Sequence, residues 1–125
     1  MGRIETTIDR DANLTVRTVT GEVTAQEIVD ALAAYLAGEV TRYILWDCRE
    51  ALWDRLTGSD VRNIAQATLK HSGRRPGGRT ALLVSSAAAF GMARMIDQSL
   101  SASDSPVEFQ TFYDRAAALA WLGGE

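Results

Sequence analysis

The stretch RYILWD, Arg42–Asp47, decides the predicted fold, because it is the clearest buried strand in the chain. It is a short, continuous apolar run with β-branched and aromatic residues, which is typical of a strand covered on both faces. We expect Trp46 to pack in the core and Asp47 to end the strand. The long polar segment Cys48–Asp60 follows. In a parallel α/β sheet, ligands and partners usually bind at this end of the strands.

Strand-like and helix-like patterns alternate around this stretch. Upstream, two segments of period-two alternation flank a polar turn and predict a β-hairpin, and a capping box then opens a helix. Downstream, helical and strand-length apolar segments follow each other in turn. The expected elements are strands 4–8 and 14–19, a helix opened by Thr24–Glu27 and ended by Gly38, the strand 42–47, a helix opened by Thr57–Asp60, a strand 80–84, a helix over 87–100, an edge strand Val107–Phe112 and a short helix capped by Asp114.

This order, β-β-α-β-α-β-α-β-α, predicts an α/β fold in a single domain that spans residues 1–125. After the opening hairpin, each strand is followed by a helix, which implies right-handed crossovers and a mostly parallel sheet. We therefore expect a five-stranded mixed sheet packed with four helices.

The composition excludes several classes of protein. Hydrophobic residues make up 46% of the chain and charged residues 23%, which is ordinary for a globular domain. No apolar run approaches the roughly 18 residues that a membrane span requires, and the amino terminus lacks the apolar region of a secretory signal. The single cysteine, Cys48, excludes an internal disulfide and a multi-cysteine metal site. We therefore expect a cytoplasmic protein without a cofactor or a membrane span.

Sets of catalytic residues are scarce. Cys48 and the single histidine, His71, lie in different elements, which favours a structural role for each over a catalytic pair. The segment after Cys48 has the spacing of a phosphatase loop, but it lacks glycine and contains acids that would repel a phosphate. Asp47, Glu50 and Asp54 are better explained as solvated acids than as metal ligands. We therefore expect a protein that is not an enzyme and holds no metal.

Two helix starts carry hydroxyl groups at the expected binding edge. Thr57 and Ser59 surround the first, where a phosphate would meet the positive end of the helix dipole and add almost two negative charges. Ser85 and Ser86 begin the second, and small residues after them leave backbone room for an anion. The simpler interpretation is that these hydroxyls are plain helix caps. Arg94, about two turns into the second helix, is a further candidate for contacting a ligand.

Charge is distributed unevenly along the chain. The stretch Val61–Ile96 carries six of the thirteen basic residues and none of the sixteen acidic ones, so its charge is +6 and that of the remainder is −9. This asymmetry favours an acidic partner. The plainer alternative is that Lys70–Arg79 is a solvated helix end and loop. No aromatic residues are interleaved with these arginines, so a nucleic-acid partner is not expected.

The order of elements, together with Ile44–Asp47, Phe90–Met95 and the closing Ala116–Leu122, resembles the SpoIIAA-like family of small bacterial STAS/SEC14-type domains. The resemblance covers almost the whole chain and implies the SpoIIAA-like (STAS) fold. In the anti-sigma factor antagonists of that family, a partner kinase phosphorylates a serine at the start of the helix after the third strand. The matching region here contains Thr57 and Ser59. In the SEC14-type relatives, the same fold contributes to an apolar lipid pocket.

Two functional hypotheses follow. The first is a non-enzymatic regulatory module that acts by protein–protein interaction. The second is a small-molecule or lipid-binding module that holds an anionic or apolar ligand at the carboxyl edge of the parallel strands. Self-association through Val107–Phe112 or through an exposed Trp53 is a further expectation. The residues expected to form the surface for a partner or ligand are Asp47, Cys48, Trp53, Ser85, Ser86 and Arg94.

Overall fold

Strands and helices follow one another in the predicted order. The computed structural model describes residues 2–37, 41–52, 56–72, 75, 77–101 and 107–123, and within them it contains five strands and four helices. The elements are β1 (Arg3–Asp9), β2 (Leu14–Glu22), α1 (Ala25–Ala37), β3 (Tyr43–Leu52), α2 (Gly58–Ser72), β4 (Arg79–Leu83), α3 (Ala87–Ser101), β5 (Glu108–Phe112) and α4 (Arg115–Leu122).

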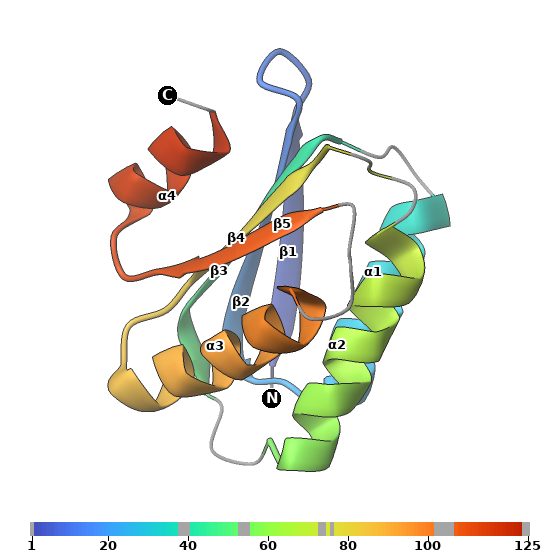
Figure 1. Ribbon diagram of the computed structural model, residues 1–125, viewed down its shortest axis with the longest axis vertical. Helices are drawn as coiled ribbons and strands as arrows, with labels where there is room; N and C mark the ends of the chain where they lie inside the picture. Colours follow the sequence, from blue (N-terminus) through green and yellow to red (C-terminus); the bar gives the residue numbers. More distant parts are fainter. Residues whose placement is uncertain are drawn as a thin grey trace.

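The five strands form one sheet in the order β1-β2-β3-β4-β5. β1 and β2 pair antiparallel, as a hairpin, and the other three neighbouring pairs are parallel. The sheet is therefore mixed and mostly parallel, as predicted, and β5 lies at an edge. Helices α1, α2 and α3 cover one face and α4 covers the other (Figure 1). This arrangement brings the carboxyl ends of four strands to one edge of the sheet.

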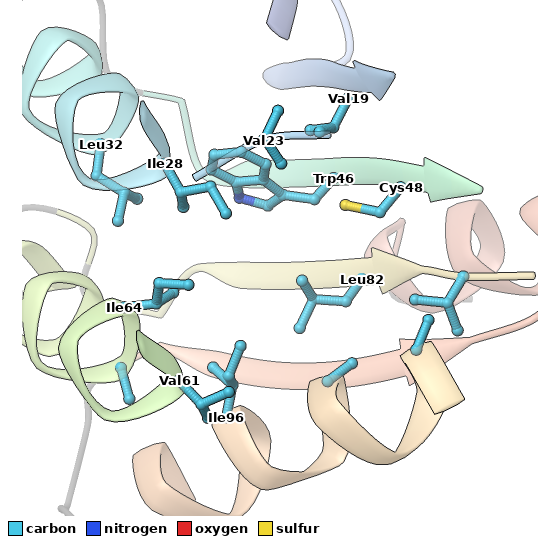
Figure 2. Close-up of a cluster of buried hydrophobic side chains, with 14 of the residues drawn as sticks. Val19, Val23, Ile28, Leu32, Trp46, Cys48, Val61, Ile64, Leu82 and Ile96 are labelled. Carbon is cyan, nitrogen blue, oxygen red and sulfur yellow. The ribbon is translucent and has the colours of Figure 1, made fainter. Parts of the chain in front are cut away.

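The larger core lies between the sheet and the three-helix layer. Alternate residues of β3 point into it, so that Trp46 and Cys48 face the apolar side chains of α1 and α2, such as Ile28 and Ile64 (Figure 2). Trp46 is buried, which confirms its predicted packing role, and the guanidinium of Arg17 on the neighbouring strand lies 5.1 Å from the centre of its ring. A smaller core on the other face joins β3, β4 and β5 to α4.

The helices begin where their capping residues predicted. Thr24 Oγ1 accepts from the amide of Glu27, whose carboxylate accepts from the amide of Thr24 in return. Asp114 accepts from the amide of Ala117 at the start of α4. These bonds satisfy amide groups that a helix end otherwise leaves without partners.

The prediction that β3 ends at Asp47 is wrong, because the strand continues to Leu52. Its second half pairs with the end of β2, where Glu50 lies opposite Thr20 and Leu52 opposite Glu22 after a shift in register. Asp47 is only partly buried and its carboxylate is bound by Arg49, so the charge does not prevent the strand from continuing.

The interpretation of residues 70–79 as a solvated helix end and loop is wrong for Arg75. This side chain is only 8% exposed. Its guanidinium donates to Thr41 O at 2.9 Å, Arg42 O at 2.8 Å, Arg79 O at 3.0 Å and Thr80 Oγ1 at 2.9 Å. Hydrogen bonds from a charged donor compensate for its burial, and they join the amino ends of β3 and β4.

Candidate functional site at the carboxyl edge of the sheet

The start of α2 carries the two candidate phosphorylation sites, Thr57 and Ser59. Thr57 Oγ1 accepts from the amide of Asp60 at 3.1 Å, and Asp60 Oδ2 accepts from the amide of Thr57 at 2.9 Å. The Thr57 hydroxyl therefore takes part in a reciprocal capping box, which agrees with the interpretation of these hydroxyls as plain helix caps. Ser59 lies in the first turn and is exposed to solvent. Of the two hydroxyls, that of Ser59 is the one whose modification leaves the cap in place.

The start of α3 lies beside the end of β3. Ser86 Oγ accepts from the amide of Ala89 at 3.1 Å and thereby caps the helix. Ser85 Oγ donates to the carbonyl oxygen of Arg49 at 2.6 Å. Both serines are exposed. Ser85 therefore ties the loop after β4 to β3, and Ser86 acts as a cap.

Asp47 forms an ion pair that sequence reasoning missed. Arg49 Nε and Nη2 donate to the two carboxylate oxygens of Asp47 at 2.9 and 2.8 Å. This bidentate contact lowers the pKa of Asp47 below its ordinary value. The pair lines a polar groove of about 360 Å³ together with Thr18, Val19 and Glu50. The sequence could have indicated this ion pair, because Asp47 and Arg49 are two positions apart in one strand and therefore share a face.

Cys48 does not belong to this edge, and its assignment to a partner or ligand surface is wrong. Its side chain points to the opposite face, in the larger core, and is 4% exposed. Burial raises the pKa of the thiol to about 12. The thiol is therefore protonated at neutral pH and is not an available nucleophile. It lines an apolar interior cavity of about 50 Å³, next to Trp46 and Leu82.

Arg94 belongs to a second cluster, which we call the α3 stack: Phe90, Arg94 and Tyr113. The rings of Phe90 and Tyr113 lie parallel, 4.7 Å apart with an interplanar angle of 6°. The guanidinium of Arg94 lies 5.9 Å from the centre of the Phe90 ring. Tyr113 follows β5 directly and is 53% exposed. No periodic pattern indicated a role for Tyr113, because its partner Phe90 lies on a different element.

Some predicted residues fall outside the part of the chain that the structure describes. Trp53 and Asp54 lie there, so the surface role of Trp53 stays a prediction. Within the described residues, no three potential ligands from His, Cys, Asp and Glu gather as a metal site would require. Among the same residues, no helix is long and apolar enough to cross a membrane.

The five-stranded mixed sheet with helices on both faces agrees with the predicted α/β fold class. The chain is similar, across 97% of its length, to an uncharacterised protein of the DUF3478 family from Shewanella loihica PV-4, whose crystal structure has a SpoIIAA-like fold. The two share 23% sequence identity with a TM-score of 0.60, and the match covers 93% of the Shewanella chain. No family model matches the sequence, and a search of curated proteins found no significant match. The structural likeness establishes the fold.

Proposed function

We propose that this chain is a non-enzymatic binding module that acts by protein–protein contact through the α3 stack. The observation that carries the proposal is a tyrosine, a phenylalanine and an arginine stacked at the surface, with Tyr113 half-exposed. Tyrosine and arginine are enriched among residues that dominate binding energy at interfaces. A stacked ring is already held in one conformation, so a partner loses little side-chain entropy by packing on it.

Arg94 is the positive charge that the α3 stack offers to an acidic group of a partner, although Asp97 on the same helix and Asp114 after Tyr113 also lie near. Arg94 is exposed and belongs to the basic stretch 61–96. Arg75 from the same stretch is buried, and Arg79 is half-buried, with its guanidinium 5.4 Å from the ring of Trp121. Fewer basic residues therefore remain available to a partner than the sequence suggested. Among those of this stretch that the structure describes, Arg94 is the exposed one beside the ring of Phe90.

Phosphorylation of Ser59 is the proposed regulation of this module, in line with the resemblance to anti-sigma factor antagonists. A phosphate there would lie in the first turn of α2, near amide groups that point out of the helix end. It would also lie near the carboxylate of Asp60, which the capping box holds in place. The added charge would change the surface of this helix end without removing the Thr57 cap.

Affinity capture from cell extract tests the protein-contact proposal. The wild type is compared with Tyr113→Ala and Arg94→Ala, and with Arg62→Ala as the matched control, because Arg62 is an exposed arginine on a different helix. We expect one protein to be recovered with the wild type and with Arg62→Ala and to be lost with both variants of the α3 stack. Recovery of the same proteins by all four would refute the proposal.

A second candidate function is the binding of a small polar ligand in the groove beside Asp47 and Arg49. The groove of about 360 Å³ falls within the roughly 300–1,000 Å³ of known ligand sites, and it offers both carboxylate groups and a guanidinium. The interior cavity of about 50 Å³ is much smaller than such sites, which disfavours a lipid. Thermal shift across a panel of charged metabolites tests this candidate. A ligand that stabilises the wild type but not Arg49→Ala would support it, and stabilisation of both alike would count against it.

A further inference from the structure

β1 is an outer strand of the sheet and is almost entirely exposed. Of its seven residues, Arg3–Asp9, only Ile4 is partly buried, and Ile8 is among the exposed large hydrophobic residues of the chain. Natural edge strands are usually protected by charged side chains, especially lysine, by proline, by a bulge or by short length. β1 carries the charged residues Arg3, Glu5 and Asp9 but no lysine or proline, and its pairing with β2 is regular throughout.

The sequence of β1 is complementary to itself in one antiparallel register. With Thr6 opposite Thr6 of a second copy, Arg3 lies opposite Asp9, Ile4 opposite Ile8 and Glu5 opposite Thr7, and each pair occurs twice. All seven residues are then paired, with a cation facing an anion at both ends and apolar facing apolar inside them. Cross-strand pairs of these kinds stabilise a sheet.

The two nearest alternative registers that keep each side chain on the same face of the sheet are disfavoured. With Glu5 at the symmetry axis, Glu5 lies opposite Glu5 of the second copy. With Thr7 at the axis, Glu5 lies opposite Asp9, and this pair occurs twice. Like charges directly opposite each other destabilise a strand pair. The charges of β1 therefore favour one register over both of its neighbours, as a specific pairing of β1 with itself would require.

We propose that a second copy of this chain pairs with β1 along the edge of the sheet, in the register centred on Thr6. The twofold axis is then perpendicular to the sheet, so that the three-helix layers of both copies lie on the same side and ten strands form one continuous sheet. In the single chain, Arg3 Nη2 lies 2.9 Å from Glu5 Oε1. In the dimer, Arg3 gains Asp9 of the second copy as another acidic neighbour. The opposite edge lacks this match, since β5 pairing with itself about Gln110 would place Glu108 opposite Phe112.

Oxidation of single-cysteine variants tests the register. Directly opposite residues in an antiparallel pair have Cα atoms about 4.5–5.5 Å apart, within the range that a disulfide spans. Thr6→Cys should therefore form a covalent dimer under mild oxidation. Thr7→Cys is the matched control, because residue 7 of each copy is displaced by two positions from residue 7 of the other, about 8 Å away. Both sites are exposed, and Cys48 is buried, so neither variant should disturb the fold or cross-link through Cys48.

Charge substitution at Thr7 tests the same pairing by affinity. In the proposed register Thr7 lies opposite Glu5 of the second copy, so Thr7→Lys creates two favourable cross-strand pairs and Thr7→Glu creates two unfavourable ones. We expect sedimentation equilibrium to give a dissociation constant about fivefold lower for Thr7→Lys, and about fivefold higher for Thr7→Glu, than for the wild type. Circular dichroism confirms that each variant is folded.

The expected result is a reversible dimer of the wild type, opposite shifts for the two charge variants and a covalent dimer of Thr6→Cys alone. A wild type that remains monomeric at the highest attainable concentration would overturn the proposal. Equal cross-linking of Thr6→Cys and Thr7→Cys, or equal dissociation constants for Thr7→Lys and Thr7→Glu, would overturn it too.

Discussion

Replacement of Arg75 by methionine should strongly destabilise the fold. Among the described residues, the guanidinium donates to four acceptors, three of which are backbone carbonyls at the amino ends of β3 and β4. At about 1.5 kcal/mol each, the low end for a charged donor, these bonds contribute about 6 kcal/mol. Desolvation of the charge costs several kcal/mol and offsets roughly half of that. We therefore expect Arg75→Met to lower the free energy of unfolding by about 3 kcal/mol.

Urea denaturation measures this loss, and thermal unfolding should show it as a midpoint lower by about 12 °C, at about 4 °C per kcal/mol for a domain of this size. Arg62→Met makes the same change at an exposed position and should alter stability by less than about 0.5 kcal/mol. Arg75→Lys should fall between the two, because an ammonium group reaches fewer of the four acceptors. If Arg75→Met is as stable as Arg62→Met, the network does not hold the strand ends together.

Three other predictions concern titratable groups. Arg49 lowers the pKa of Asp47, so the stability that this pair contributes is present above pH 3.8 and is lost as the pH falls through the folded-state pKa. Asp47→Asn should therefore lower the free energy of unfolding by at most about 1 kcal/mol at pH 7 and by less in acid. A loss of stability that does not change with pH would contradict this prediction. Burial raises the pKa of Asp97 although Thr111 donates a hydrogen bond to its carboxylate, so the folded state holds the proton more tightly than the unfolded state does. As the pH rises from 3.8, urea denaturation should show the wild type losing stability relative to Asp97→Asn. The opposite trend would be contrary evidence. Cys48, with its raised pKa, should react with a thiol reagent only after unfolding, and rapid labelling of the folded protein at pH 7 would show that the thiol is accessible.

Local sequence patterns predicted the elements well because the signals for them are themselves local. The capping residues Thr24, Thr57 and Asp114 act within one helical turn, and each occupies the predicted position. The apolar run of β3 needed only its own composition to be recognised. The end of this strand was predicted wrongly because its length depends on pairing with β2, which is distant in the sequence.

The candidate site was predicted less well, because it depends on which faces and elements meet. Alternation along β3 places Cys48 on the same face as the buried Trp46, so its core position was accessible from the sequence, and so was the shared face of Asp47 and Arg49. The burial of Arg75 was not, since its acceptors belong to residues more than thirty positions away as well as to its own loop. Tyr113 was missed for a similar reason, because only the packing of α3 beside β5 brings it to Phe90.

Photo-crosslinking in living cells tests the proposed protein contact most directly. A photoreactive phenylalanine analogue at position 113 replaces the exposed tyrosine of the α3 stack, and the same analogue at the exposed position 62 serves as the control. We expect position 113 to give a discrete adduct with a protein other than this chain and position 62 to give none. No adduct from position 113, or the same adducts from both positions, would contradict it.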